Sequence, residues 1–390
     1  MFARAPRFAA SLTAAVSLIA LQATPALAFD PSGNSVADAF LTLLDAEQGT
    51  VESYGAVDES GNSVTIGDIV ITNESDEDAR VTIASTELTD GEIQDNGRLK
   101  LSGLTISDLE LTADDGGMSL GSLTVTDLLL PSADEMGSDT APVGPGYKTF
   151  EASTIRISDE NGKIADIAKI SSSIDGMDGD LPTAGSFAVT GATVDVTQLE
   201  AKESKALTEL GYDTLSVDLA GSGSWDPNAA TLVIPEIKID AKEAASLSLS
   251  FSLGGVTRDV VTQLNQKSKK PEEAMALLQN VTVEKARIRL NDASLTGRIL
   301  EQEAQKAGVA TPQYVAGITG TLPLMLGMLQ NKELEAQVTQ AVTEFLNTPG
   351  SLELTAAPAA PVPLAQIMGT AMLAPQMIPQ ILSVGISANQ

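Results

Sequence analysis

A ten-residue pattern of alternating apolar and polar residues recurs through the first third of this 390-residue chain. It reads VTIGDIVITN from Val64, VTIASTELTD from Val81, LKLSGLTISD from Leu99 and MSLGSLTVTD from Met118, so successive copies start 17, 18 and 19 residues apart. Such alternation is typical of a strand with one buried face. A single copy cannot bury that face alone, so the recurrence predicts a stack of neighbouring strands.

The apolar residues of each copy come in pairs, and successive pairs are separated by a step of three residues. Between residues 99 and 111 the pairs are Leu99/Leu101, Leu104/Ile106 and Leu109/Leu111. In a flat strand this step would send successive pairs to opposite faces. A bulge at Ser102–Gly103 and at Ser107–Asp108 would restore the facing and give an elongated, curved antiparallel sheet. A corner every five residues would instead give a β-solenoid.

The strand pattern continues beyond the four copies. A fifth copy at 150–159 follows a segment at 131–149 that is rich in Pro, Gly and Ser, which predicts a surface loop. A looser copy covers 187–196, and three longer strands with turn residues between them follow at 214–225, 231–240 and 246–255. These strands favour the sheet, built from repeats of about 18 residues, over the solenoid.

The two ends of the chain have helical periodicity. A short helix is expected within 29–50, with Ser35 as its N-cap. From 257 to 390 the pattern is mainly helical, with strands returning at 281–290, 351–356 and 383–388, and an apolar helix at 364–382 is broken by Pro375 and Pro379. The predicted fold is α+β and mainly β, a sheet spanning 51–256 and packed by C-terminal helices.

Residues 1–28 have the features of a secretory signal peptide. Arg4 and Arg7 precede an apolar run that ends near Leu21, and Ala26–Leu27–Ala28 supplies the small residues of a cleavage site. We expect cleavage after Ala28 and a periplasmic protein, with an extracellular one as the alternative. No later segment reaches the roughly 18 apolar residues of a membrane span, so none is predicted in the mature chain.

The composition excludes several classes of function. The chain has no His and no Cys, which removes Ser-His-Asp and Cys-His catalysis and His or Cys metal sites. Its formal net charge of −29 repels nucleic acid and anionic membrane surfaces. Aromatic residues make up only 3%, which disfavours surfaces that stack on sugars or bases. We therefore expect a protein that is not an enzyme.

Acidic residues give the candidate metal site. Asp175, Asp178 and Asp180 lie close together among glycines, which would suit a Ca²⁺ loop built from carboxylate oxygens. Their spacing does not fit the EF-hand rule, so a turn between strands is the favoured interpretation and no cofactor beyond this Ca²⁺ is expected. An acid also ends several copies of the strand pattern, where we expect it to mark corners: Asp90, Asp108, Asp127 and Asp159.

Methionines on the C-terminal helices give the second candidate site. Met fills irregular apolar space, which suits a groove for an apolar ligand but suits an ordinary core equally well. Core packing is the favoured interpretation. The residues are Met325, Met328, Met368, Met372 and Met377.

The strand pattern over residues 64–256 resembles that of AsmA-like envelope proteins and related lipid-handling β-groove proteins of Gram-negative bacteria. The segment APVPLAQIMGTAMLAPQMIPQILSVGISANQ also resembles exported alphaproteobacterial proteins. The first resemblance implies an extended sheet whose apolar concave face shields acyl chains. The chain departs from that family in its cleavable signal and its shorter length, and no functional residue carries over.

Three hypotheses about function follow. The leading one is a periplasmic, non-enzymatic protein that holds a lipid, or an envelope protein partner, in an apolar groove. The second is an exported acidic structural or surface protein that binds Ca²⁺ weakly through its acidic turns. The third is a carboxylate-based hydrolase, which needs two acids facing each other across a cleft.

Overall fold

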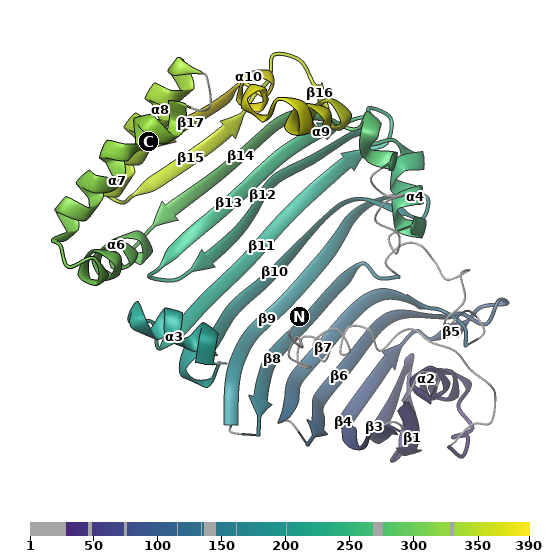
Figure 1. Cartoon of the computed structure of the whole chain (residues 1–390). Helices are drawn as coiled ribbons and strands as arrows, with labels where there is room; N and C mark the ends of the chain where they lie inside the picture. Colours follow the sequence, from purple (N-terminus) through teal and green to yellow (C-terminus); the bar gives the residue numbers. More distant parts are fainter. Residues whose placement is uncertain are drawn as a thin grey trace. The chain divides into compact units, whose positions relative to one another are not determined.

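The computed structural model describes residues 29–45, 49–73, 76–114, 116–133, 135, 146–160, 162–199, 201–267, 276–327 and 331–390 (Figure 1). The predicted signal peptide lies outside the described residues. The chain divides into two compact units, Met1–Ser173 (unit 1) and Ile174–Gln390 (unit 2).

The strands form one open antiparallel sheet of 17 strands. Neighbours in the sheet are mostly neighbours in the sequence: β3 pairs with β4, β6 with β7, β7 with β8, and β10 to β14 pair in succession. This antiparallel meander confirms the predicted mainly β fold with C-terminal helices, and it is not the alternative solenoid.

The described residues of unit 1 contain one α-helix and most of the repeated strands. Its described elements are α2 (Ser35–Asp45), β1 (Gly49–Ser53), β2 (Val57–Ser60), β3 (Ser63–Asn73), β4 (Asp76–Thr89), β5 (Glu92–Ile93), β6 (Leu99–Ala113), β7 (Gly116–Leu130), β8 (Thr149–Asp159) and the first part of β9 (Gly162–Asp178). The described residues of 131–148 contain no helix or strand, where a loop is predicted.

Unit 2 contains the remaining strands and the other described helices. Its described elements are β10 (Leu181–Asp195), η1 (Val196–Gln198), α3 (Ala201–Glu209), β11 (Thr214–Asp226), β12 (Thr231–Ala241), β13 (Ala245–Gly254), α4 (Arg258–Lys267), η2 (Leu278–Asn280), β14 (Thr282–Asp292), α6 (Leu295–Lys306), α7 (Thr311–Leu326), α8 (Lys332–Asn347), β15 (Ser351–Ala356), β16 (Val362–Pro363), α9 (Leu364–Leu373), η4 (Pro375–Met377), α10 (Ile378–Ile381) and β17 (Val384–Ala388).

A row of residues with left-handed backbone explains the step of three in the strand pattern. Asp68, Asp108 and Thr154 lie inside strands yet have φ of 47°, 50° and 56°. The register of the flanking pairs places Asp68 and Asp108 on either side of Ala84 of β4. It likewise places Asp108 and Thr154 on either side of Gly121 of β7. One residue in this conformation reverses the facing of the strand, so the apolar pairs on both sides of it reach the same face.

A second row uses two of the acids that end the copies. Asp90 and Asp127 have φ of 49° and flank Ser102 of β6. Hydrogen bonds from Ser102 Oγ at 2.6 Å and from Asn62 Nδ2 at 2.7 Å lower the pKa of the Asp90 carboxyl. Aspartate tolerates the left-handed region better than most residues, which accounts for its recurrence at these positions.

The apolar pairs of unit 1 form its buried core. Ile66, Ile83, Leu101 and Leu109 are all less than one-tenth exposed, and α2 adds its own apolar face to the same cluster. Asn34, rather than the predicted Ser35, caps α2: its Oδ1 accepts hydrogen bonds from the N–H groups of Val36 and Ala37 at 3.0 and 3.1 Å. A side chain must precede the first turn to reach these N–H groups, and Ser35 is already helical.

Candidate functional site

The strands of unit 2 place apolar side chains on one face of their part of the sheet. Each strand alternates Leu, Ile or Phe with Ser, Lys or Arg, and the register aligns the apolar positions into rows across the strands. We call this the apolar face. Its two central rows are Val189, Leu219, Ile239, Leu247, Leu290, Leu352 and Ala388, and Phe187, Gly221, Ile237, Leu249, Ile288, Leu354 and Ile386.

The opposite face of the same strands is polar. Glu353 Oε2 accepts hydrogen bonds from Arg287 at 2.6 Å and from Arg289 at 2.9 Å, and these two guanidinium groups lower the pKa of the Glu353 carboxyl. Nearer the middle of the sheet, Lys242 lies 2.8 Å from Asp218 and 3.1 Å from Asp240. These ion pairs are half-exposed, as expected for a solvated face.

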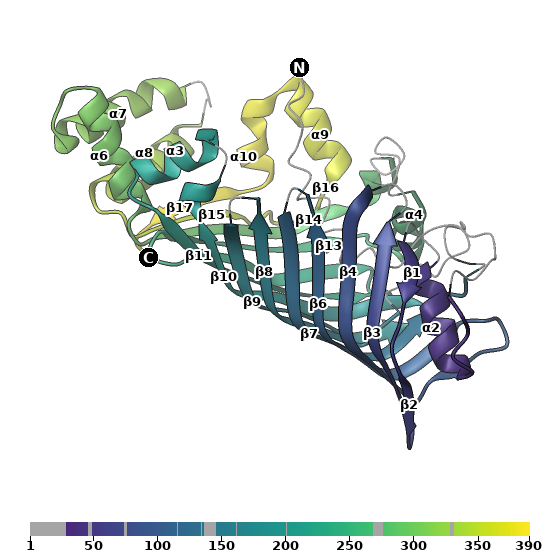
Figure 2. The same cartoon turned by 90° about the horizontal axis from the view of Figure 1, so that it is seen from below.

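Two helices cover the margins of the apolar face. Along one edge, Phe345 of α8 packs against Leu290, Leu352 and Ile386. At one end of the strands, Val260 of α4 packs with Trp225. Trp225 is itself fixed by a 2.7 Å hydrogen bond from its indole Nε1 to the carbonyl oxygen of Val256. Figure 2 shows α6 to α10 on one side of the unit 2 strands.

The centre of the apolar face is open. Phe187, Ile239, Leu247, Ile288 and Leu354 are 40%, 44%, 41%, 42% and 41% exposed. Single exposed apolar residues are ordinary, but a contiguous set on adjoining strands is of the order of a few hundred Å², a size that marks binding surfaces. This open centre is the candidate site.

Gly221 shapes the middle of this surface. A Cβ atom at residue 221 would lie 2.7 Å from the ring of Phe187 and 3.1 Å from Ile237 Cγ1. The absence of a side chain therefore lets the Phe187 ring lie across β11. The result is a continuous apolar surface where a larger residue would hold the ring away from the strand.

The predicted methionines do not form the core that the sequence favours. Met325 and Met372 are highly exposed, Met377 is exposed, and Met368 is half-buried. Met328 lies outside the described residues. The exposed methionines sit at or near helix ends, whereas the open apolar surface of unit 2 is made by strands, whose alternation does not show which residues stay exposed.

The predicted Ca²⁺ residues are not gathered around one point. Asp175 and Asp178 lie in β9 and Asp180 in the turn that follows. The Asp178 carboxylate forms an ion pair with Arg258. The described part of the chain contains no group of three acidic, His or Cys side chains placed to hold a metal. The favoured interpretation, a turn between β9 and β10, describes what Gly179 and Asp180 form.

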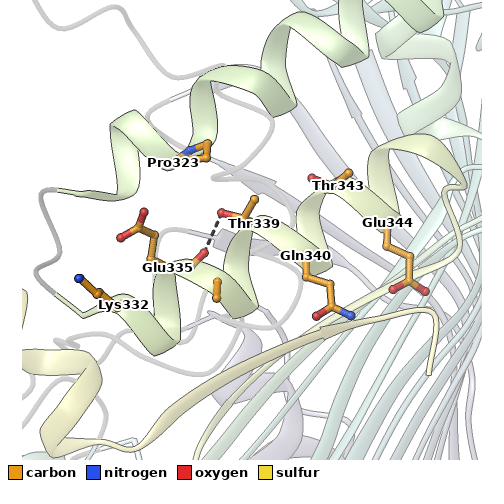
Figure 3. A pocket seen from close by; sticks show the side chains of 8 residues that line it. Pro323, Lys332, Glu335, Thr339, Gln340, Thr343 and Glu344 are labelled. Atoms are coloured by element: carbon orange, nitrogen blue, oxygen red, sulfur yellow. Dashed lines mark hydrogen bonds between the residues drawn. The ribbon is translucent and has the colours of Figure 1, made fainter.

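A hollow of about 770 Å³ lies between α7 and α8 (Figure 3). Pro323 lines it from α7 and Ala336 from α8, together with six polar side chains of α8: Lys332, Glu335, Thr339, Gln340, Thr343 and Glu344. Thr339 Oγ1 donates a 2.7 Å hydrogen bond to the Glu335 carbonyl oxygen within its own helix. The hollow is wide open to solvent, unlike the enclosed clefts that bury most of a ligand's surface.

The described carboxyl groups with shifted pKa values bear on the predicted carboxylate-based hydrolase. In the described residues, every carboxyl with a clearly shifted pKa is shifted downward by hydrogen-bonding partners: Asp90, Glu135, Asp218, Asp240 and Glu353. A general acid at neutral pH needs a raised pKa. The geometry therefore offers more to an apolar ligand than to a hydrolytic reaction.

Comparison with known proteins adds one finding. The model of a family described as an uncharacterized protein matches residues 238–389, which run from β12 to β17. None of the curated proteins matches the chain. Within the described residues, no helix has both the length and the apolar character that crossing a bilayer requires.

Proposed function

We propose that this chain is a periplasmic, non-enzymatic lipid-binding protein, and that the open centre of the apolar face holds an acyl chain. The observation that carries the proposal is the row of exposed Leu, Ile and Phe side chains on adjoining strands, bordered by α8 and α4. The resemblance to β-groove envelope proteins supports the same function. The predicted signal peptide supports the compartment.

The dimensions of the row suit an acyl chain. From Phe187 on β10 to Leu354 on β15 the row crosses six strands, and strands lie about 4.8 Å apart, so it extends about 24 Å. One leaflet of a bilayer has a hydrocarbon thickness of about 15 Å, half of the 30 Å core. A single fatty-acyl chain therefore fits along the row.

The contact energy sets the expected affinity. Each fully buried methylene contributes about 0.8 kcal/mol, and a chain lying on a sheet buries about half of its surface. Sixteen methylenes then contribute about 6 kcal/mol, which corresponds to a dissociation constant of about 40 μM before the cost of ordering the chain. Binding in the range of tens to hundreds of micromolar is the expected result.

A pair of substitutions on one strand tests the proposal. Ile239 and Val233 both lie on β12 with similar exposure, 44% and 38%, but Val233 pairs with Ser224 and Ser252 on the polar face. Ile239→Glu places a carboxylate in the open centre of the apolar face, beside the row along which the acyl chain lies, so it should weaken binding of a fluorescent fatty acid about tenfold or more. Val233→Glu should leave binding at the wild-type level.

Titration of the fluorescent fatty acid with each purified protein measures the effect, and mass spectrometry of the wild-type protein identifies lipid that copurifies. Circular dichroism checks that both variants fold. Equal binding by the two variants would place the ligand elsewhere. Absence of binding and of copurified lipid in the wild type would refute the proposed function.

A further inference from the structure

Two helix ends in unit 2 present apolar side chains fully to solvent. Leu324 and Met325, in the last turn of α7, are 84% and 67% exposed, and Met372 and Leu373, at the end of α9, are 86% and 90% exposed. We call these four residues the helix tips. Figure 2 shows α7 and α9 on the same side of the unit 2 strands. Exposure this high exceeds that of any residue on the apolar face.

The helix tips lie in segments without charged residues. Residues 307–331 and 354–390 contain no Asp, Glu, Lys or Arg, although the whole chain has a formal net charge of −29. A membrane surface, anionic or zwitterionic, that approached other parts of the chain would meet a strongly acidic protein. These two segments bring no carboxylate side chain of their own to a membrane that they approach.

We propose that the helix tips insert into the interfacial region of a lipid bilayer, docking unit 2 on the membrane from which it takes or to which it gives an acyl chain. The purpose of this docking rests on the proposed function. Apolar side chains at the end of a helix enter the boundary between headgroups and acyl chains, about 5–10 Å deep. The expected surface is electrically neutral, because the protein is acidic.

The small size of the helix tips favours a bilayer over a protein partner. Protein interfaces bury broad surfaces and are enriched in aromatic residues, Met and Arg. The helix tips contain only Leu and Met, two adjacent residues at each helix end. Narrow apolar projections of this kind suit a fluid surface that closes around them.

Flotation of the full-length protein with phosphatidylcholine vesicles tests the inference. The Met372→Glu, Leu373→Glu double variant should reduce the floated fraction about tenfold, because insertion would carry two carboxylates into the interface. Its matched control is the Val233→Glu, Ile299→Glu double variant, which adds the same charge at two apolar residues, 38% and 40% exposed, that lie outside both uncharged segments. The control should float as the wild type does.

Two further measurements separate this inference from the proposed function. Fluorescent fatty acid in solution, without vesicles, should bind the tip variant as well as the wild type. Exchanging phosphatidylcholine for phosphatidylglycerol should lower flotation, and added salt should restore it. Wild-type protein that binds the fatty acid but does not float, or a tip variant that floats normally, would overturn the docking. Flotation without fatty-acid binding would overturn only the proposed function.

Discussion

Thr86 is a buried hydroxyl whose replacement should stabilise the protein. It lies on β4, is 0% exposed, and faces the unit 1 core between Ile66 of β3 and Ile106 of β6. Its Oγ1 has no hydrogen-bond partner among the described residues. Burying a hydroxyl without a partner costs about 1–3 kcal/mol in measured protein variants.

Thr86→Val keeps the shape of the side chain and replaces this hydroxyl with a methyl group. We expect the free energy of unfolding to rise by about 1–2 kcal/mol, because the desolvation cost disappears and a methyl group is buried instead. For a folded unit of about 150 residues this corresponds to a melting temperature higher by about 2–8 °C. Urea unfolding followed by far-UV circular dichroism measures the change, with the midpoint rising and the slope unchanged.

Thr82→Val is the matched control, since Thr82 lies on the same strand but on the opposite, partly exposed face. It makes the same chemical change and raises β propensity equally, so it should alter stability by no more than about 0.5 kcal/mol. A Thr86→Val midpoint at or below that of the wild type would show that the hydroxyl has a partner in solution and would refute the reasoning.

Three further predictions concern conformation, pH and calcium. Thr154→Asn should raise the unfolding free energy by about 1 kcal/mol in urea titrations, because a β-branched residue at φ of 56° is strained and Asn tolerates that region. The hydrogen bonds of Arg98 lower the pKa of Glu135 to about 2 from 4.5, so this carboxyl contributes stability above pH 4.5 that is lost as the pH falls toward 2. Arg98→Gln should remove that part of the pH profile of the melting temperature, and a profile identical to the wild type would contradict it. With Asp178 already ion-paired, thermal melts in millimolar Ca²⁺ and in chelator should coincide, and a clear Ca²⁺-dependent rise would restore the calcium-loop hypothesis.

The strand pattern predicted the sheet because both of its spacings, the alternation of two residues and the step of three between apolar pairs, can be read within a single strand. Leu109 follows the Leu104/Ile106 pair by three residues, and a reversal of facing at Asp108 is the structural answer. Whether that reversal is a bulge or a solenoid corner depends on the residues opposite, here Ala84 and Gly121, whose pairing is not encoded in one strand's periodicity.

The candidate site could be predicted from the sequence only in part. Alternation shows that Ile239 and Leu247 share a face, but it does not show whether a helix covers them. That depends on where α8 lies, and Phe345 fixes α8 against the edge strands only. The prediction that the methionines pack in a core was wrong for Met325, Met372 and Met377, which are exposed. Apolar residues at a helix end have the same periodicity whether they face a core or solvent.

The sequential pairing of β10 to β14 has a consequence for how such a protein can change over generations. Because each strand pairs with the strands next to it in the chain, a hairpin such as Thr231–Gly254 is a self-contained insert. Tandem duplication or deletion of the DNA that encodes such a hairpin would lengthen or shorten the apolar face by about 10 Å without changing the pairing of the other strands. Such events would thereby set the length of the molecule that the apolar face can hold.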